Sequence, residues 1–241
     1  MRVIAKLDIK QNDLIKSIRY DGVRKIGNPE EYIKKYVNFD IDEIVILSPT
    51  SPLYNTKIDL DFLKRLNKYC NIPIMAGGGV KKLNDAKDLI KNGAEKIILN
   101  TLFHEDIKET KKIIKTFGST SVVASIEYKK VENKYETFHT MARSKTNLNL
   151  KDSIDYLEEI EVGEIILNNI NNDGKLNGID EDEEIIKIIN EKKNIPFLIN
   201  GGFISFDQIK KYQNIFSGII ISSALHYGKI TNEDIKKFKY G

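Results

Sequence analysis

The segment NIPIMAGG at positions 71–78 occurs again in related form as NIPFLING at positions 194–201. Three further pairs match in the same order: 42–47 with 163–168, 7–10 with 126–129, and 98–101 with 220–223. The members of each pair lie about 120 residues apart, which is half of the 241-residue chain. Four matches at a common offset indicate that the fold is built from a duplicated unit.

Short segments rich in Ile and Val have the composition of strands buried on both faces of a parallel sheet. They lie at 3–9, 43–47, 72–76, 96–100, 121–127, 164–168, 195–200 and 218–222. Helical patterns alternate with them, the first from Pro29 and the others near 58–69, 82–92, 105–116, 149–160, 180–192, 205–213 and 231–239.

This alternation predicts an α/β fold, either a (βα)8 TIM barrel or a doubly wound open sheet. The duplication favours the barrel, because two similar (βα)4 halves give it pseudo-twofold symmetry. We therefore expect a single domain, 1–241, made of half-barrels at about 1–119 and 120–241.

Several helix starts carry capping signals. Asn28 precedes Pro29 and two acidic residues, the pattern of an N-cap followed by a first helical turn. Ser205 with Gln208, and Thr231 with Asp234, have the spacing of capping boxes.

The composition excludes several classes of protein. Lys and Arg number 38 against 35 Asp and Glu, and this balance does not favour binding to nucleic acid or to a membrane surface. The single cysteine, Cys70, excludes an internal disulfide framework. Charges at positions 6 and 8 interrupt any signal-peptide core, and no apolar run approaches the roughly 20 residues of a membrane span. We expect a soluble cytoplasmic protein.

Two carboxylates occupy matching places in the repeat. Asp8 ends the first predicted strand and Glu127 ends the fifth. Catalytic groups of such barrels lie at the carboxyl ends of the strands, so the two would face each other across one mouth. Their environments can then divide acid and base roles between them. The alternative is that each carboxylate only caps a loop or pairs with Lys10 or Lys129.

Glycine and small polar residues gather after other strands. Glycine lets the backbone approach an anion closely, and the following helix N-termini offer N–H groups, so the pattern predicts two phosphate sites. The alternative is ordinary tight-turn geometry. The candidate phosphate-binding residues are Gly78, Gly79, Asn100, Thr101, Asp173, Gly174, Gly201, Gly202, Ser222 and Ser223.

Charged residues mark the opposite mouth, at the starts of strands. Two cations and two anions there have compensating signs and could form a ring of salt bridges under the core, although ordinary solvated charge is the alternative. They are Arg2, Glu43, Lys96 and Glu164.

Other chemistry is not indicated. His104, His139 and His226 are scattered without a metal-ligand spacing, and the dinucleotide and P-loop glycine patterns are missing, so we expect no metal and no cofactor. Cys70 precedes the third strand, on the wrong mouth for a nucleophile. The stretch 129–145 is longer than a usual loop and is expected to be either a flap over the substrate or a solvated excursion.

These residues resemble the cyclase (synthase) subunit of imidazole glycerol phosphate synthase, the HisF-like family of histidine biosynthesis. The resemblance covers nearly the whole chain. The segments that carry it are 7–10, 41–43, 76–79, 100–101, 117–119, 163–165, 173–174, 201–202 and Ser222. The run 117–119 with 125–126, and the four charged residues of the lower mouth, favour the cyclase over the related isomerase of the same pathway.

The resemblance implies an enzyme, a lyase that is one subunit of a glutamine amidotransferase. A separate glutaminase subunit docks on the N-terminal face of the barrel, and its ammonia passes the charged gate and the barrel core. At the other mouth ammonia converts a bisphosphorylated ribulosyl-aminoimidazole-carboxamide into imidazole glycerol phosphate and an aminoimidazole carboxamide ribotide. Asp8 and Glu127 take the positions of the family's acid/base aspartates, and Lys16 matches a lysine in the mobile loop after the first strand.

The chain departs from the family at the chemical mouth. Glu127 replaces an aspartate, and Ser48 stands where the second strand usually ends in an aspartate. The segments 11–13 and 171–172 also differ from the usual pattern. Two alternatives therefore remain: a divergent paralogue that delivers ammonia for amidination in bacterial surface-sugar biosynthesis, and a non-catalytic scaffold for a glutaminase.

Overall fold

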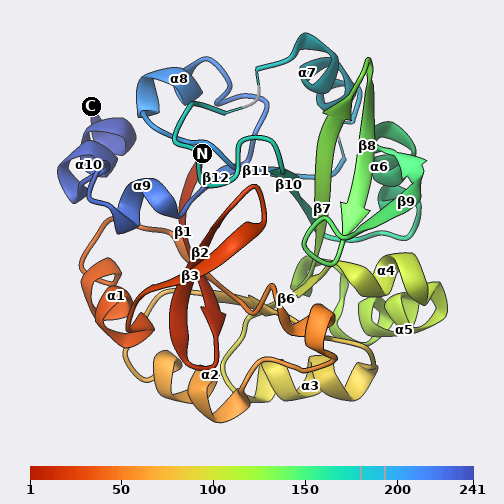
Figure 1. Cartoon of the computed structure of the whole chain (residues 1–241), viewed down its shortest axis with the longest axis horizontal. Helices are drawn as coiled ribbons and strands as arrows, with labels where there is room; N and C mark the ends of the chain where they lie inside the picture. Colours follow the sequence, from red (N-terminus) through yellow and green to blue (C-terminus); the bar gives the residue numbers. More distant parts are fainter. Residues whose placement is uncertain (180, 193) are drawn as a thin grey trace.

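The computed structural model describes residues 1–179, 181–192 and 194–241, whose centre is a closed barrel of eight parallel strands (Figure 1). In order around the barrel these are β1 (Arg2–Lys10), β4 (Glu43–Leu47), β5 (Ile74–Gly77), β6 (Lys96–Leu99), β7 (Val122–Val131), β10 (Glu164–Asn169), β11 (Phe197–Asn200) and β12 (Gly218–Ile221). Each pairs in parallel with the next, and β12 pairs with β1. The predicted (βα)8 barrel is confirmed, and the open sheet is excluded because the strands close on themselves.

Helices surround the barrel (Figure 1). They are α1 (Pro29–Tyr36), α2 (Leu60–Asn67), α3 (Leu83–Lys91), α4 (Thr101–Glu105), α5 (Ile107–Phe117), α6 (Leu150–Glu159), α7 (Glu183–Asn190), α8 (Phe206–Lys210), α9 (Ser223–His226) and α10 (Asn232–Tyr240), with 3-10 turns η1 (Ser51–Tyr54) and η2 (Ser119–Ser121). The expected helix at 105–116 is α5, which begins at Ile107 because the Asp106 carboxylate accepts the Glu109 N–H at 3.0 Å, and Glu105 instead ends the short helix α4. The expected helix at 180–192 is α7, and Asp180 lies outside the described residues. Within the described ranges, none of the helices has the length and apolar composition that crossing a bilayer requires.

Two of the three capping predictions are confirmed. The Asn28 side chain accepts the Glu30 N–H at 3.0 Å, and Thr231 forms the expected capping box. Ser205 makes no side-chain capping bond, so that prediction is wrong. Its expected partner Gln208 instead accepts the Ile179 N–H at 3.0 Å, which ties α8 to a neighbouring loop.

The interior of the barrel is filled by one apolar layer. Because side chains alternate along a strand, every second residue of each strand faces inward. One residue from each barrel strand forms this layer: Ile4, Val45, Met75, Ile98, Val123, Ile166, Leu198 and Ile220. A larger apolar cluster packs the outside of the strands against the helices. The barrel is therefore a packed core with polar groups only above and below this layer.

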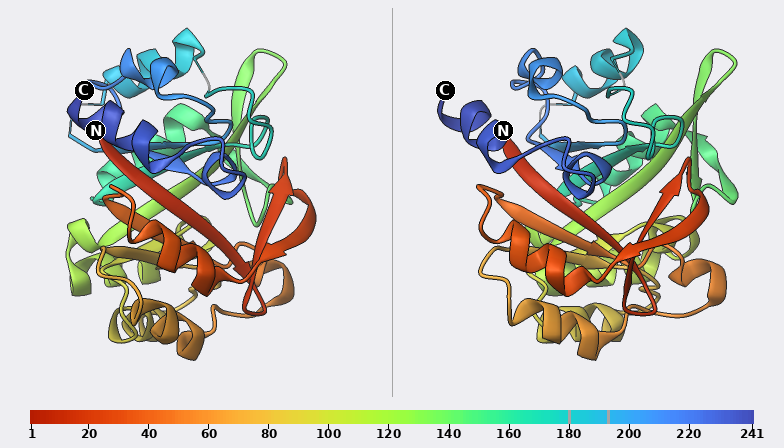
Figure 2. Two further views of the ribbon diagram at one scale, coloured as in Figure 1. Left: turned by 90° about the vertical axis from the view of Figure 1, so that its left-hand side faces the viewer. Right: turned by 60° about the vertical axis from the view of Figure 1, so that its left-hand side comes forward.

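Two hairpins extend the sheet at one end. After β1 the chain forms β2 (Asp13–Ile18) and β3 (Asp21–Gly27), and after β7 it forms β8 (Lys134–His139) and β9 (Ser144–Asn149), all antiparallel. In Figure 2 both hairpins project from the end of the barrel opposite the N-terminus. The long excursion expected at 129–145 is thus an ordered extension of β7.

Candidate active site

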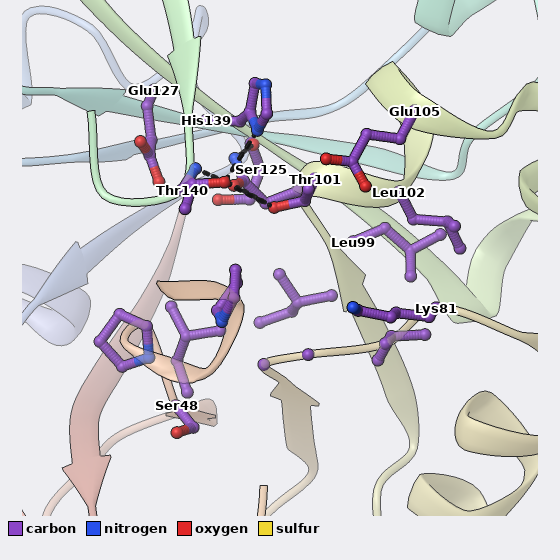
Figure 3. A pocket seen from close by; sticks show the side chains of 18 of the residues that line it. Ser48, Lys81, Leu99, Thr101, Leu102, Glu105, Ser125, Glu127, His139 and Thr140 are labelled. Carbon is purple, nitrogen blue, oxygen red and sulfur yellow. Dashed lines mark hydrogen bonds between the residues drawn. The ribbon is translucent and has the colours of Figure 1, made fainter. Parts of the chain in front are cut away.

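Asp8 lies near the carboxyl end of β1, and Glu127 lies near the end of the part of β7 that pairs within the barrel. Each is in the inward register of its strand and each is buried. A cavity of about 450 Å³ opens at this mouth, and Glu127 forms part of its wall. In Figure 3 Glu127 lies beside Ser125 and Thr140, while Ser48 and Lys81 line the facing side. Lys10 and Lys129 do not pair with the carboxylates, because each lies over an aromatic ring, Lys10 over Tyr54 and Lys129 over Phe138.

Glu127 is held by the second hairpin. The Ala142 N–H donates to Oε2 of Glu127 at 2.6 Å. Ala142 follows Thr140 and Met141 in a turn in which all three residues have left-handed φ angles between 56° and 58°. Burial raises the pKa of Glu127 from its ordinary 4.5 to about 7, although the backbone hydrogen bonds and the charge of Lys6 oppose the rise. The group can therefore hold a proton near neutral pH.

Asp8 has the opposite environment. Oδ1 lies 3.1 Å from the Nζ of Lys6, and Oδ2 lies 3.5 Å from the Nζ of Lys16. Burial alone would raise the pKa of Asp8, but the charges of Lys6 and Lys16 hold it below its ordinary value. Asp8 is therefore ionised where Glu127 is still protonated.

The first hairpin brings Lys16 to this position. Asp173, in the loop after β10, accepts the Ser17 hydroxyl at 3.0 Å and the Tyr20 N–H at 3.2 Å. Gly174 lets the hairpin approach, since a Cβ there would lie 2.4 Å from the Ser17 carbonyl oxygen. The carboxylate of Asp173 is thus engaged with the hairpin, and its backbone N–H donates to the Asn169 carbonyl oxygen at 3.0 Å.

One glycine-rich set lines the main cavity. Gly78 and Gly79 have φ angles of 120° and 74°, and Asn100 and Thr101 begin α4 beside them. The Asn100 side chain receives the Thr140 N–H at 3.2 Å, and Thr101 contacts the Thr140 hydroxyl at 3.3 Å. This set is therefore joined to the turn that holds Glu127.

The other set lies across the mouth. Gly201, Gly202, Ser222 and Ser223 line a second, much smaller cavity of about 20 Å³, together with Gly174. Lys16 also lines it. The small volume reflects the hairpin, which packs over this side of the mouth.

The four charged residues of the lower mouth form a closed ring. Arg2 bonds to both Glu43 and Glu164, and the Lys96 Nζ lies 3.1 Å from Glu43 and 3.4 Å from Glu164. Each of the two glutamates therefore forms ion pairs with both Arg2 and Lys96. The ring lies two residues before the apolar layer on each of its strands, at the amino ends of β1, β4, β6 and β10.

A polar layer separates the apolar layer from the carboxylates. Asn168 donates to the Ser125 hydroxyl at 2.9 Å, and Asn200 donates to the Asn168 side-chain oxygen at 2.7 Å. Lys6 lies between Ile4 and Asp8 in the same inward register. From the ring upward, the inward-facing residues of the barrel are therefore charged, apolar, polar and again charged.

Several site residues escaped the sequence analysis. Lys6 could have been found from the alternation along β1, which places it on the face of Asp8. His139, at the end of β8, is among the residues that line the cavity, but only the hairpin brings it there. Tyr20 and Ser125 also line the cavity. Among the described residues, no cluster of three or more His, Cys, Asp or Glu side chains has the geometry of a metal site.

Comparisons with known proteins show the family of this chain. The family model of the histidine biosynthesis protein matches residues 2–231. The imidazole glycerol phosphate synthase subunits HisF of Thermococcus onnurineus and Pyrococcus furiosus are each 31% identical to this chain, over 98% of its length and 94% of theirs. The HisF subunit of Thermotoga sp. (strain RQ2) is 28% identical over 98% of this chain and 93% of its own. The chain therefore belongs to the histidine biosynthesis protein family, in the branch of the HisF subunits.

Proposed function

We propose that this chain is the cyclase subunit of a cytoplasmic imidazole glycerol phosphate synthase and acts in histidine biosynthesis. One observation carries the proposal: two buried carboxyl groups lie at one barrel mouth, between two glycine-rich sets. The pKa of Glu127 is raised and that of Asp8 is lowered, so that one keeps its proton where the other has lost it. The relatives named above support the histidine role over a surface-sugar role or a scaffold, because all are named as the HisF subunit of imidazole glycerol phosphate synthase.

The site suits ring formation from ammonia and a ketose phosphate. When ammonia adds to the ketone carbon, the ketone oxygen needs a proton and the new nitrogen must lose one. Glu127, protonated near neutral pH, supplies the first proton, and the ionised Asp8 accepts the second. Lys16 keeps Asp8 charged from the hairpin side.

The two phosphates of the substrate bind at the two glycine-rich sets. Backbone N–H groups at Gly78 and Gly79 serve one phosphate, with Asn100 and Thr101. The other binds at a second set: Gly174, Gly201, Gly202, Ser222 and Ser223. Because the sets lie on different sides of the mouth, a substrate with a phosphate at each end lies across the carboxylates. Asp173 fixes the hairpin over it.

A separate glutaminase docks on the face that carries Arg2, Glu43, Lys96 and Glu164, and its ammonia enters there. The ring is the gate, because it closes the lower end of the barrel directly under the apolar layer. Lys96→Glu removes a cation shared by two glutamates. We expect glutamine-driven turnover to fall while ammonium-driven turnover is kept. Unchanged coupling of glutamine hydrolysis to product would exclude the gate role.

The direct test supplies the purified chain with the ribulosyl-aminoimidazole bisphosphate and an ammonium salt. We expect release of both products without any partner. Glu127→Gln should lower kcat at least about 100-fold, whereas Glu95→Gln, at an exposed position, should leave it unchanged. A chain that binds a glutaminase but makes no product from ammonium would refute the proposed function.

A further inference from the structure

Lys6 is a buried cation inside the barrel. It is the third of four inward-facing residues along β1, after Arg2 and Ile4 and before Asp8. Its side chain is 4% exposed, and its Nζ lies 3.1 Å from Oδ1 of Asp8. Burying an ammonium group is expensive unless a partner compensates it, so the position calls for a physical reason.

The two oxygens of Asp8 are held from opposite directions. Lys6 approaches Oδ1 from the barrel interior, and Lys16 approaches Oδ2 from the hairpin. Lys16 also lies 3.9 Å from Asp173, so its charge is shared between two carboxylates. No such second carboxylate within 4.0 Å is found for Lys6 among the residues that the structure describes, and its charge is therefore directed at Asp8.

Glu127 has no cation of this kind. Among residues 1–179, 181–192 and 194–241, no Lys or Arg nitrogen forms an ion pair with it, and its clear contact is the Ala142 N–H. The other ionisable groups around the pair are Lys16 on β2, Asp173 after β10, His226 on α9 and Tyr20 between β2 and β3. The two carboxylates thus differ chiefly in the cations that touch them.

We propose that Lys6 is a positioning residue for the reaction: its ammonium group fixes Asp8 from below as the proton acceptor and leaves Glu127 as the proton donor. The inference rests on the proposed function for the reaction it serves. It adds to that function a residue that holds the acceptor from inside the barrel, independently of the hairpin that carries Lys16. Without Lys6, the buried Asp8 would keep only Lys16, whose charge is shared with Asp173, and it would take up a proton more readily.

The test uses Lys6→Met, which keeps the length of the side chain and removes its charge. Lys10→Met is the matched control, because Lys10 lies on the same strand and its ammonium contacts the Tyr54 ring instead. The pH profile of kcat/KM for the bisphosphate substrate is measured at a fixed concentration of free ammonia. The titration of ¹³C-labelled Asp and Glu carboxyl groups is followed by NMR in the absence of substrate, with Asp8→Asn and Glu127→Gln for assignment.

We expect Lys6→Met to move the acidic limb of the profile, and the NMR titration of Asp8, upward by about one to three pH units. Glu127 should move up less, because Lys6 does not touch it, and Lys10→Met should move neither. A lower kcat, with the acidic and alkaline limbs of the pH profile at unchanged pH values, would show that Lys6 only supports the fold and would overturn the proposal.

Two further outcomes keep the inferences separate. If Lys6→Met does not fold, the NMR titration of the unmodified protein decides: Asp8 must lose its proton at lower pH than Glu127, and the reverse order overturns the proposal. If the unmodified protein makes no product from ammonium, the proposed function fails. The NMR shift on Lys6→Met still tests the contact between Lys6 and Asp8.

Discussion

Replacing Glu127 by glutamine should stabilise the protein at alkaline pH while destroying its activity. The pKa of this buried carboxyl is raised from 4.5 to about 7, so the folded chain binds the proton more tightly than the unfolded chain does. The contribution of protonated Glu127 to stability is complete below about pH 4.5 and is lost as the pH rises through about 7.

The magnitude follows from the shift. One pKa unit corresponds to about 1.4 kcal/mol, so the free energy of unfolding should lose about 3 kcal/mol across this interval. Glutamine carries no charge at any of these pH values, and its side-chain oxygen can still accept the Ala142 N–H. Between about pH 5 and about pH 8, the stability of Glu127→Gln relative to the unmodified protein should therefore rise by about 2 to 3 kcal/mol.

Urea unfolding at the two pH values measures this difference. Tyrosine fluorescence and circular dichroism are suitable signals, because the chain has 11 Tyr and no Trp. Glu95→Gln, at an exposed position, controls for the loss of one negative charge. A stability difference for Glu127→Gln that stays constant between the two pH values would refute the argument that burial raises the pKa of Glu127.

Two further predictions concern the glycine-rich mouth and the helix caps. Gly202→Ala should destabilise the fold well beyond Gly228→Ala, because its Cβ would lie 2.0 Å from the Gly178 carbonyl oxygen, whereas nothing lies within 4 Å at Gly228. Gly228→Ala has only the left-handed backbone to oppose it, about 1 kcal/mol, and equal losses in urea unfolding would contradict the steric argument. Thr231→Ala should remove about 1 kcal/mol of stability, whereas Ser205→Ala, where no side-chain cap exists, should leave the melting temperature unchanged.

Most of the barrel could be predicted from the sequence because its signals are local. Runs rich in Ile and Val marked each barrel strand, and the strand at 43–47 has the predicted bounds. The repeat then distinguished closure from an open sheet, which no single strand could do. We propose that the two halves, about 1–119 and 120–241, descend from one unit, and the hairpins that follow β1 and β7 support this.

The hairpins themselves were not predicted, since their strands carry mixed polar residues. The strand β3, for example, reads DGVRKIG, and most of its residues are exposed. Its stability comes from pairing with β2 and not from its own composition. The same holds for β9, whose residues alternate between half-buried and exposed. Hairpins of this kind are stabilised by pairing with neighbouring strands, and the residue composition of each strand alone does not predict that pairing.

The positions of the two carboxylates could be predicted from the sequence, but their protonation states could not. Position along a strand was enough to nominate Asp8 and Glu127, because strand ends converge at one mouth. Their protonation depends on the burial of Glu127, which keeps its proton, and on Lys6 in the interior of β1, which holds Asp8 ionised. Such contacts follow only from the closed barrel and the packed hairpin, so the sequence placed the carboxylates without distinguishing the donor from the acceptor.

The order of the layers inside the barrel bears on what can pass through it. An ion that left the lower ring would have to cross eight apolar side chains without compensation, which is energetically prohibitive in a packed core. At the upper edge of that layer it would meet the ammonium group of Lys6, which repels a cation and leaves a neutral molecule unaffected. In the proposed reaction the nucleophile is neutral ammonia, because ammonium has no lone pair to donate. Lys6 and the apolar layer therefore both favour the neutral form over its conjugate acid, and the residue that holds Asp8 ready to accept a proton also opposes the arrival of ammonia that is already protonated.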